Sequence, residues 1–244
     1  MRNRYISQSA IKDFISCNKR YYYRVNFAEE AVSTIEMTIG TIIHKILEDS
    51  WNDKAKAIDL AYKLSLSYSL NKTDINTILL LVNNYFENFK SLVTEDDIIE
   101  YNFTVPYKDN IYITGKFDRI NQKGNHLVID WKTGNSFFGG TSTDIQSIIY
   151  YNSYKQLSSD IPTLMYAFLK DNKLVRYTPD QIYIDVVYNE IIPDMIEAIR
   201  LNSFPHQGLF NNSCKRCSFK NICFKELGKE NNKDKKEAIG INYD

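Results

Sequence analysis

The chain has 244 residues, of which 43% are hydrophobic and 25% are charged, so it is large enough to bury a substantial core. Thirty basic residues balance thirty acidic ones, which excludes a global basic field, so any contact with nucleic acid must use a local patch. No segment has the roughly 18 apolar residues that span a bilayer, and the first residues lack the apolar core of a signal peptide. We therefore expect a cytoplasmic protein without membrane association, a setting in which structural disulfides are rare.

Hydrophobic periodicity predicts helices in the first third of the chain and a group of strands in the middle. A helix capped by Ser7 or Ser9 is expected to run to about residue 25. Further helices are expected at about 40–51, 54–70, 74–93, 144–157 and 190–202. Strands are expected at about 98–107, 111–121, 126–132, 163–170 and 173–177, the last with a continuation near 182–188, and with turns at 109–110, 122–125 and 171–172.

The stretch Leu127-Val-Ile-Asp-Trp-Lys-Thr-Gly134 has the pattern of an apolar strand followed by a turn. Side chains alternate along a strand, so Asp130 and Lys132 share one face while Trp131 can be buried on the other. The preceding strand supplies a second acid, Asp118. Two carboxylates and a lysine at the end of an antiparallel pair indicate a site for a hard cation with an electrostatic helper. Taken alone, the motif also fits a surface ion pair between Asp130 and Lys132.

The four cysteines are divided between the two ends of the chain. Cys214, Cys217 and Cys223 form a C-x-x-C-x-x-x-x-x-C trio, and Cys17 is the only other thiol that could complete a set of four ligands. A single zinc ion or a cubane 4Fe–4S cluster would fit four thiolates. The alternative is a zinc ion held by the trio and a histidine such as His206, with Cys17 as a small buried residue.

A local basic patch follows if Cys17 joins the trio, because the first helix and the last segment would then meet. The cations involved are Lys19, Arg20, Arg24, Lys215, Arg216 and Lys220. Among them, we expect Arg20, Arg24, Lys215 and Arg216 to contact the phosphates of any bound nucleic acid.

Six short motifs occur in a fixed order over nearly the whole chain. They are Ser7-x-Ser9-x-Ile11-x-x-Phe14-x-x-Cys17-x-x-Arg20-Tyr21, Gly40-x-x-x-His44, Gly115-x-x-Asp118, Asp130-Trp131-Lys132-Thr133-Gly134, Gln146-x-x-x-Tyr150 and the cysteine trio. In these motifs the chain resembles the RecB-like branch of the PD-(D/E)XK nucleases. It is most similar to the iron–sulfur members, the CRISPR-associated Cas-four exonucleases and the AddB-type nuclease domains. Asn18 and Ser218 stand where members often have proline, and Trp131 where a smaller residue is usual.

The resemblance implies an α/β fold with a restriction-endonuclease-like central mixed β-sheet flanked by helices. It also implies an N-terminal helical insertion and a C-terminal cysteine-rich iron–sulfur staple. We expect a single nuclease domain over residues 1–227, with the insertion at about 36–95, the sheet core at about 96–188 and the cluster segment at 204–227 closing on Cys17. Residues 228–244 have the composition of a disordered tail.

For the site, the resemblance implies that His44, Asp118, Asp130 and the backbone carbonyl of Trp131 hold Mg²⁺ or Mn²⁺, an imidazole ligand being compatible with manganese. Lys132 would orient the attacking water and offset charge growing on the phosphate. Gln146 and Tyr150 would position the DNA strand or support the ligands. The alternatives are a His44–Glu48 pair on one helix, and plain helix-to-sheet packing by Gln146 and Tyr150.

The activity that the resemblance implies is that of a metal-dependent DNA exonuclease acting on single-stranded ends. Its four cysteines, Cys17, Cys214, Cys217 and Cys223, would hold a 4Fe–4S cluster. Such a nuclease would serve DNA processing, recombination, repair or CRISPR adaptation, with CRISPR adaptation proteins or a helicase as partners. A catalytically weak DNA-binding or assembly subunit of a larger complex is the alternative.

Overall fold

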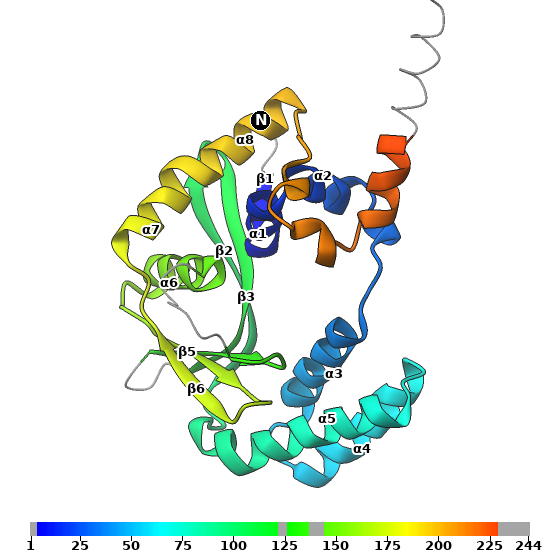
Figure 1. Cartoon of the computed structure of the whole chain (residues 1–244). Helices are drawn as coiled ribbons and strands as arrows, with labels where there is room; N and C mark the ends of the chain where they lie inside the picture. The colour runs from blue at the N-terminus through cyan, green and yellow to red at the C-terminus, as the bar shows by residue number, and fades with distance from the viewer. Residues whose placement is uncertain (1–3, 122–125, 137–143, 229–244) are drawn as a thin grey trace, which may run out of the picture. The chain divides into compact units, whose positions relative to one another are not determined.

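The computed structural model describes residues 4–121, 126–136 and 144–228, and Figure 1 shows the course of the chain. Two compact units are formed, each from two separate segments. The sheet unit comprises Met1–Ser9 and Thr34–Asp194, and the cysteine unit comprises Ala10–Ser33 and Met195–Asp244. No helix among the described residues is long and apolar enough to cross a membrane.

The sheet unit is built on one mixed sheet of six strands. The strands are β1 (Arg4–Ser7), β2 (Ile98–Lys108), β3 (Ile111–Asn121), β4 (Leu127–Lys132), β5 (Thr163–Phe168) and β6 (Lys173–Tyr177). Their order is β1-β3-β4-β5-β6, and β2 also pairs with β3. The β1–β3 and β4–β5 pairs are parallel, whereas β2–β3, β3–β4 and β5–β6 are antiparallel. The expected central mixed sheet flanked by helices is confirmed.

Two of the expected turns join strands within the sheet. Asp109 and Asn110, with φ of 47° and 62°, link β2 to β3 in the left-handed conformation that these short polar residues tolerate. Asn172, with φ of 50°, lies in the turn between β5 and β6. The turn expected at 122–125 lies outside the described residues.

The helical elements are as follows. In the sheet unit or crossing its boundary are α1 (Gln8–Ser16), α3 (Ile35–Ser50), α4 (Lys54–Ser67), α5 (Lys72–Asn84), η2 (Tyr85–Phe89), η3 (Lys90–Leu92), α6 (Ile145–Ser158), α7 (Gln181–Val186), η5 (Val187–Ile191) and α8 (Ile192–Leu201). The cysteine unit also has α2 (Asn18–Asn26), η1 (Ala28–Glu30), η6 (Gln207–Leu209), η7 (Ser213–Arg216) and a helical segment over 220–228. Side chains of Thr34, Asp53, Asn71 and Asp144 cap the starts of α3, α4, α5 and α6.

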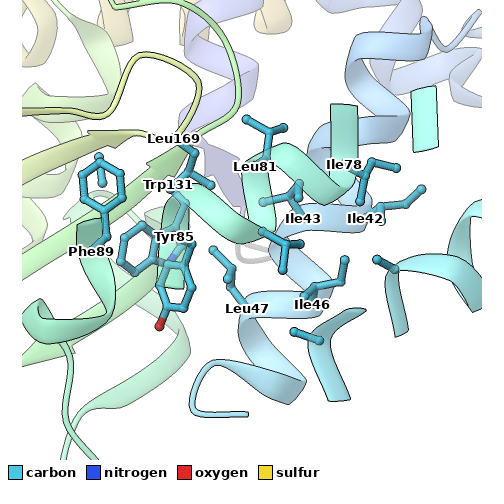
Figure 2. Packing of buried hydrophobic residues seen from close by; sticks show 14 of the residues in the cluster. Ile42, Ile43, Ile46, Leu47, Ile78, Leu81, Tyr85, Phe89, Trp131 and Leu169 are labelled. Atoms are coloured by element: carbon cyan, nitrogen blue, oxygen red, sulfur yellow. The ribbon is translucent and has the colours of Figure 1, made fainter. Parts of the chain in front are cut away.

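The main core lies between α3, α4 and α5 and the strands β4 and β5. Figure 2 shows Ile43 and Leu47 of α3 and Leu81 of α5 in this cluster together with Trp131 of β4. Trp131 is 4% exposed, and its ring meets that of Tyr85 at 89° with centroids 5.3 Å apart. The alternation along β4 therefore holds, since Trp131 is buried among the helices while Asp130 and Lys132 pair with each other.

Two expectations about elements were wrong, and one strand was missed. The single helix to residue 25 is two helices, α1 and α2, because Cys17 between them is extended at φ −172° and ψ 122°. The strand expected near 182–188 is helical, because Ile184 and Val187 are buried three residues apart, which fits a helix face rather than alternation. Strand β1 was not expected at all. The tail beyond residue 228 lies outside the described residues.

Candidate functional site

The candidate site of the sheet unit lies where β3 and β4 stop pairing. Their ladder joins Arg119–Asn121 to Leu127–Ile129 and ends beside Asp118 and Asp130. Beyond this point β3 pairs with β2, and β4 pairs with β5. The backbone N–H of Trp131 donates to Asp118 Oδ2 over 2.9 Å, which ties the two strands together. Two acids that are 12 residues apart in sequence are thus held in one buried place.

The two buried aspartates carry unfavourable like charge. Asp118 is 6% exposed and Asp130 is 3% exposed. Burial first, and then the negative charge of Asp130, raise the pKa of Asp118 well above its ordinary value. A divalent cation would offset both the burial and the repulsion, because it supplies the missing opposite charge.

His44 of α3 and Glu100 of β2 complete a set of metal-ligand side chains around Asp118. One potential ligand atom from each of His44, Glu100 and Asp118 lies within 4.8 Å of the other two. His44 Nδ1 is 3.4 Å from Asp118 Oδ2. Burial lowers the pKa of His44, and the nearby carboxylates oppose this only in part. The imidazole is therefore neutral near pH 7, as a metal ligand must be. Glu48 pairs instead with Lys45, at 3.1 Å.

Glu100 is the site residue that sequence reasoning missed. Its neighbours Ile99 and Tyr101 pair with Arg119 and Phe117, which leaves Glu100 opposite Asp118. Its φ of 52° is left-handed, a rare conformation for a residue inside a strand. An acid within the mostly apolar and aromatic run 98–103 was the available signal. That signal gains meaning only from the β2–β3 register.

Asp130 is hydrogen-bonded by a second set of side chains, separate from the set of His44, Glu100 and Asp118. Lys132 Nζ lies 2.6 Å from Asp130 Oδ2 and donates to Gln146 Oε1 over 2.6 Å. Gln146 Nε2 in turn donates to Asp130 Oδ1 and to the Tyr150 hydroxyl, the latter over 2.9 Å. The Tyr150 hydroxyl donates to the carbonyl of Lys116. Gln146 and Tyr150, one turn apart on α6, therefore hydrogen-bond to each other and to groups of β3 and β4.

Lys132 is a permanent positive charge at this place. Burial alone would lower its pKa, but the charge and hydrogen bond of Asp130 outweigh burial, and the net pKa is raised. The ring of Tyr166 lies 4.5 Å from Lys132 Nζ, and its hydroxyl donates to Asp144, the cap of α6, over 2.6 Å. An ammonium group so held is suited to stabilise negative charge rather than to accept a proton.

A cavity of about 1000 Å³ opens beside these groups within the sheet unit. His44, Glu100, Asp118 and Tyr150 are among the residues that line it. Its other lining residues come from β1, α1, α3, β2 and β3. The potential metal ligands therefore face a space large enough for part of a polymer.

The cysteine unit brings all four thiols together, and none of them is in a disulfide. Cys17, Cys214, Cys217 and Cys223 line one small cavity. A Cβ placed at Gly208 would be 3.3 Å from Cys17 Sγ and 3.4 Å from Cys214 Sγ, so these two sulfurs approach one point. Burial, followed by Cys17 and Cys217, raises the pKa of Cys214. His206 is not among the described residues that line this cavity.

The expected DNA-contacting cations have partners that the sequence did not reveal. Arg20 Nε lies 2.8 Å from Asp13 Oδ1, and Arg24 pairs with the other oxygen of the same buried acid. Lys215 and Arg216 are exposed on η7. Because Asp13 offsets one charge of the arginine pair, the patch is less positive than the sequence indicated.

Comparison with known proteins identifies the family of the chain. Residues 5–224 match the sequence model of the PD-(D/E)XK nuclease superfamily. The crystal structure of a protein named "Putative exonuclease" from Eubacterium rectale is similar to the chain, with a TM-score of 0.60, 12% identity and 82% of each chain covered. The crystal structure of SSO0001 has a TM-score of 0.47 and 16% identity, covering 91% of this chain and 87% of its own. No curated protein matches. Since the family match covers most of its length, the chain belongs to the PD-(D/E)XK nuclease superfamily.

Proposed function

We propose that this nuclease is a metal-dependent deoxyribonuclease that hydrolyses phosphodiester bonds from single-stranded DNA ends. The observation that carries the proposal is the grouping of His44, Glu100 and Asp118 within 4.8 Å of one another. Two carboxylates and a neutral imidazole are hard and borderline donors, which fit Mg²⁺ or Mn²⁺. The raised pKa of Asp118 has the same implication, because a cation would relieve it.

The ligands in this proposal are His44, Asp118 and Glu100, with Asp130 and the backbone carbonyl of Trp131 completing the set. A bound ion would polarise a phosphate oxygen and lower the pKa of the attacking water. The proposed catalytic role of Lys132 is to place its ammonium beside the negative charge that develops on the phosphate. Gln146 accepts a hydrogen bond from Lys132 and donates one to Asp130, and its amide also donates to the Tyr150 hydroxyl.

The catalytically weak DNA-binding or assembly subunit remains the rival. The complete set of acids, histidine and lysine argues against it, because a site without selection for catalysis has no reason to keep a buried pair of aspartates. The exonuclease mode draws support from the name of the structure from Eubacterium rectale, with which the chain shares a fold. A helicase or CRISPR adaptation proteins are the partners that this function would have.

The cysteine unit is proposed to hold a 4Fe–4S cluster of structural rather than catalytic role. Support comes from the four thiols around one cavity and from their absence from the lining of the larger cavity. Cys17 precedes the trio by almost 200 residues, so shared ligation would close a long loop in the unfolded chain. A single zinc ion is the other occupant that fits four thiolates.

DNA phosphates are proposed to contact Lys215 and Arg216, with Arg20 and Arg24 contributing less because Asp13 engages both of them. Each phosphate contact adds about one unit to the slope of the logarithm of the binding constant against the logarithm of the salt concentration. An unchanged salt slope in a Lys215→Ala, Arg216→Ala variant would remove these residues from the DNA-binding surface.

The experiment that tests the proposed function uses end-labelled single-stranded and double-stranded DNA with Mg²⁺, Mn²⁺ or a chelator. We expect degradation of the single-stranded DNA from an end, only when the metal is present. Internal cleavage of circular single-stranded DNA would contradict the exonuclease mode. DNA binding without cleavage in either metal would favour the assembly subunit.

A further inference from the structure

A row of polar side chains runs away from the candidate metal site along the face of three strands. Two residues beyond Asp118 and Glu100, Asn102 of β2 pairs in register with Lys116 of β3. Two residues further, Thr104 of β2 pairs with Thr114 of β3, and Thr114 pairs with Ser7 of β1. We call these five residues, Asn102, Lys116, Thr104, Thr114 and Ser7, the polar ladder. All of them line the same cavity as His44 and Asp118.

The orientation of the polar ladder is fixed by what lies on the other face of its strands. The alternate residues Phe103, Val105, Ile113 and Phe117 are all buried, at 2% exposure or less. A slip of the register by one residue would expose these four and bury the polar ones, so the register is strongly specified. The register therefore fixes the polar ladder on the face of the strands that lines the cavity.

The spacing of the polar ladder suits a repeating ligand. Residues two apart on a strand lie about 6–7 Å apart along it, so the rungs begin at the acids and recur at that interval. This is close to the repeat of an extended sugar–phosphate backbone. Hydroxyl, amide and ammonium groups are the donors that proteins use for phosphate and sugar oxygens.

The cavity is lined by the polar ladder and also by a helix. This helix is α3, from which Met37, Gly40 and Thr41 line the cavity beside His44. Met37 is 51% exposed and offers an apolar contact for a base, while Thr41 adds a hydroxyl. The space between one row of rungs and one helix suits a single strand.

We propose that the polar ladder binds the nucleic-acid strand that continues from the scissile phosphate. Asn102 takes the next phosphate together with Lys116, whose ammonium also pairs with Glu100 of the candidate metal site. Thr104, Thr114 and Ser7 take the following sugar-phosphate unit. The ligand class is a single-stranded oligodeoxynucleotide of at least four nucleotides. This inference rests on the proposed function, since that function places the scissile phosphate beside His44, Glu100 and Asp118.

The test compares a Thr104→Val, Thr114→Val double variant with the wild type. Valine keeps the shape and strand preference of threonine and replaces the hydroxyl by a methyl group. Affinity is measured by fluorescence anisotropy with labelled oligothymidylates of two to six nucleotides, in Ca²⁺ to prevent turnover. Thr163→Val is the matched control, because Thr163 begins β5 and is not among the residues lining the cavity.

We expect the double variant to bind strands of four or more nucleotides about five- to tenfold more weakly, since two hydrogen bonds are lost. The affinity for the dinucleotide should stay unchanged, and so should the control variant at every length. Equal affinity of the double variant and the wild type at all lengths would overturn the proposal. An equal loss at all lengths, the dinucleotide included, would also overturn it.

Cleavage of the same oligonucleotides in Mn²⁺ separates this inference from the proposed function. If the wild type binds with the expected length dependence but cleaves none of them, the polar ladder stands and the nuclease assignment fails. If the wild type cleaves them and the double variant cleaves and binds all lengths equally well, the nuclease stands and the polar ladder fails.

Discussion

Replacement of Gln146 by alanine tests whether α6 takes part in the chemistry. The side chain joins three groups, because its carbonyl accepts from Lys132 and its amide donates to Asp130 and Tyr150. Two of these partners are charged, and a hydrogen bond to a charged group contributes about 1.5–3 kcal/mol. If the loss of one such bond is felt in the transition state, the rate of cleavage falls about ten- to hundredfold.

The assay is single-turnover cleavage of end-labelled single-stranded DNA in Mn²⁺, with DNA affinity measured separately. We expect the rate constant of Gln146→Ala to fall by that factor, while its affinity for DNA changes less than about twofold. The reason is that Gln146 hydrogen-bonds to Lys132 and Asp130 and is not part of the polar ladder. Gln156→Ala is the matched control, since Gln156 is exposed on the same helix. A wild-type cleavage rate in Gln146→Ala would mean that α6 only packs against the sheet.

Three further predictions concern the metal site, the cysteines and the core. Glu100→Gln should weaken Mn²⁺ binding about tenfold or more in calorimetry, because a charged ligand is lost; Glu87→Gln, an exposed acid paired with Lys54, should not. Equal Mn²⁺ affinity in the wild type and Glu100→Gln would exclude Glu100 as a ligand. Protein purified without oxygen should contain about four irons per chain, and Cys17→Ser should lose them. One zinc and no iron in the wild type would replace the cluster with a zinc site. Trp131→Ala should lower the free energy of unfolding by about 3–5 kcal/mol in urea, because its buried ring fills the core beside Tyr85; a loss below about 1 kcal/mol would contradict this packing.

The sequence predicted the β4 strand well because two independent signals agree there. Alternation assigned Trp131 and Asp130 to opposite faces, and the aromatic ring needs a core that the apolar helices supply. The helices α3, α4 and α5 were recognisable for the same reason, since their apolar faces recur with helical period. Local pattern and tertiary packing point to one answer in these elements.

The parts that were missed depend on contacts between distant segments. Strand β1 has four residues, too few to show a period, and exists through its parallel pairing with β3. Glu100 acquires its place from the register of β2 against β3 and from its left-handed φ. The alternating Ile182, Ile184 and Val186 fit a strand as well as they fit the helix α7 that forms.

Charge pairing was the least accessible part of the site. Asp13 precedes Arg20 by seven residues and Arg24 by eleven, on a different helix, so the sequence gives no reason to pair them. In the structure this one buried acid engages both arginines. A count of cations along a segment therefore overestimates the charge that is available to DNA.

The most direct test of the central claim is cleavage of single-stranded DNA by Asp130→Ala and Lys132→Ala, measured as single-turnover rates in Mn²⁺. Lys63→Ala serves as the control, because Lys63 is exposed and pairs with Asp59 on α4. We predict that both site variants lose about a hundredfold or more in rate, retain DNA binding and unfold cooperatively. Wild-type cleavage by Asp130→Ala in the same metal, or cleavage by the wild type in excess chelator, would contradict the assignment of this site.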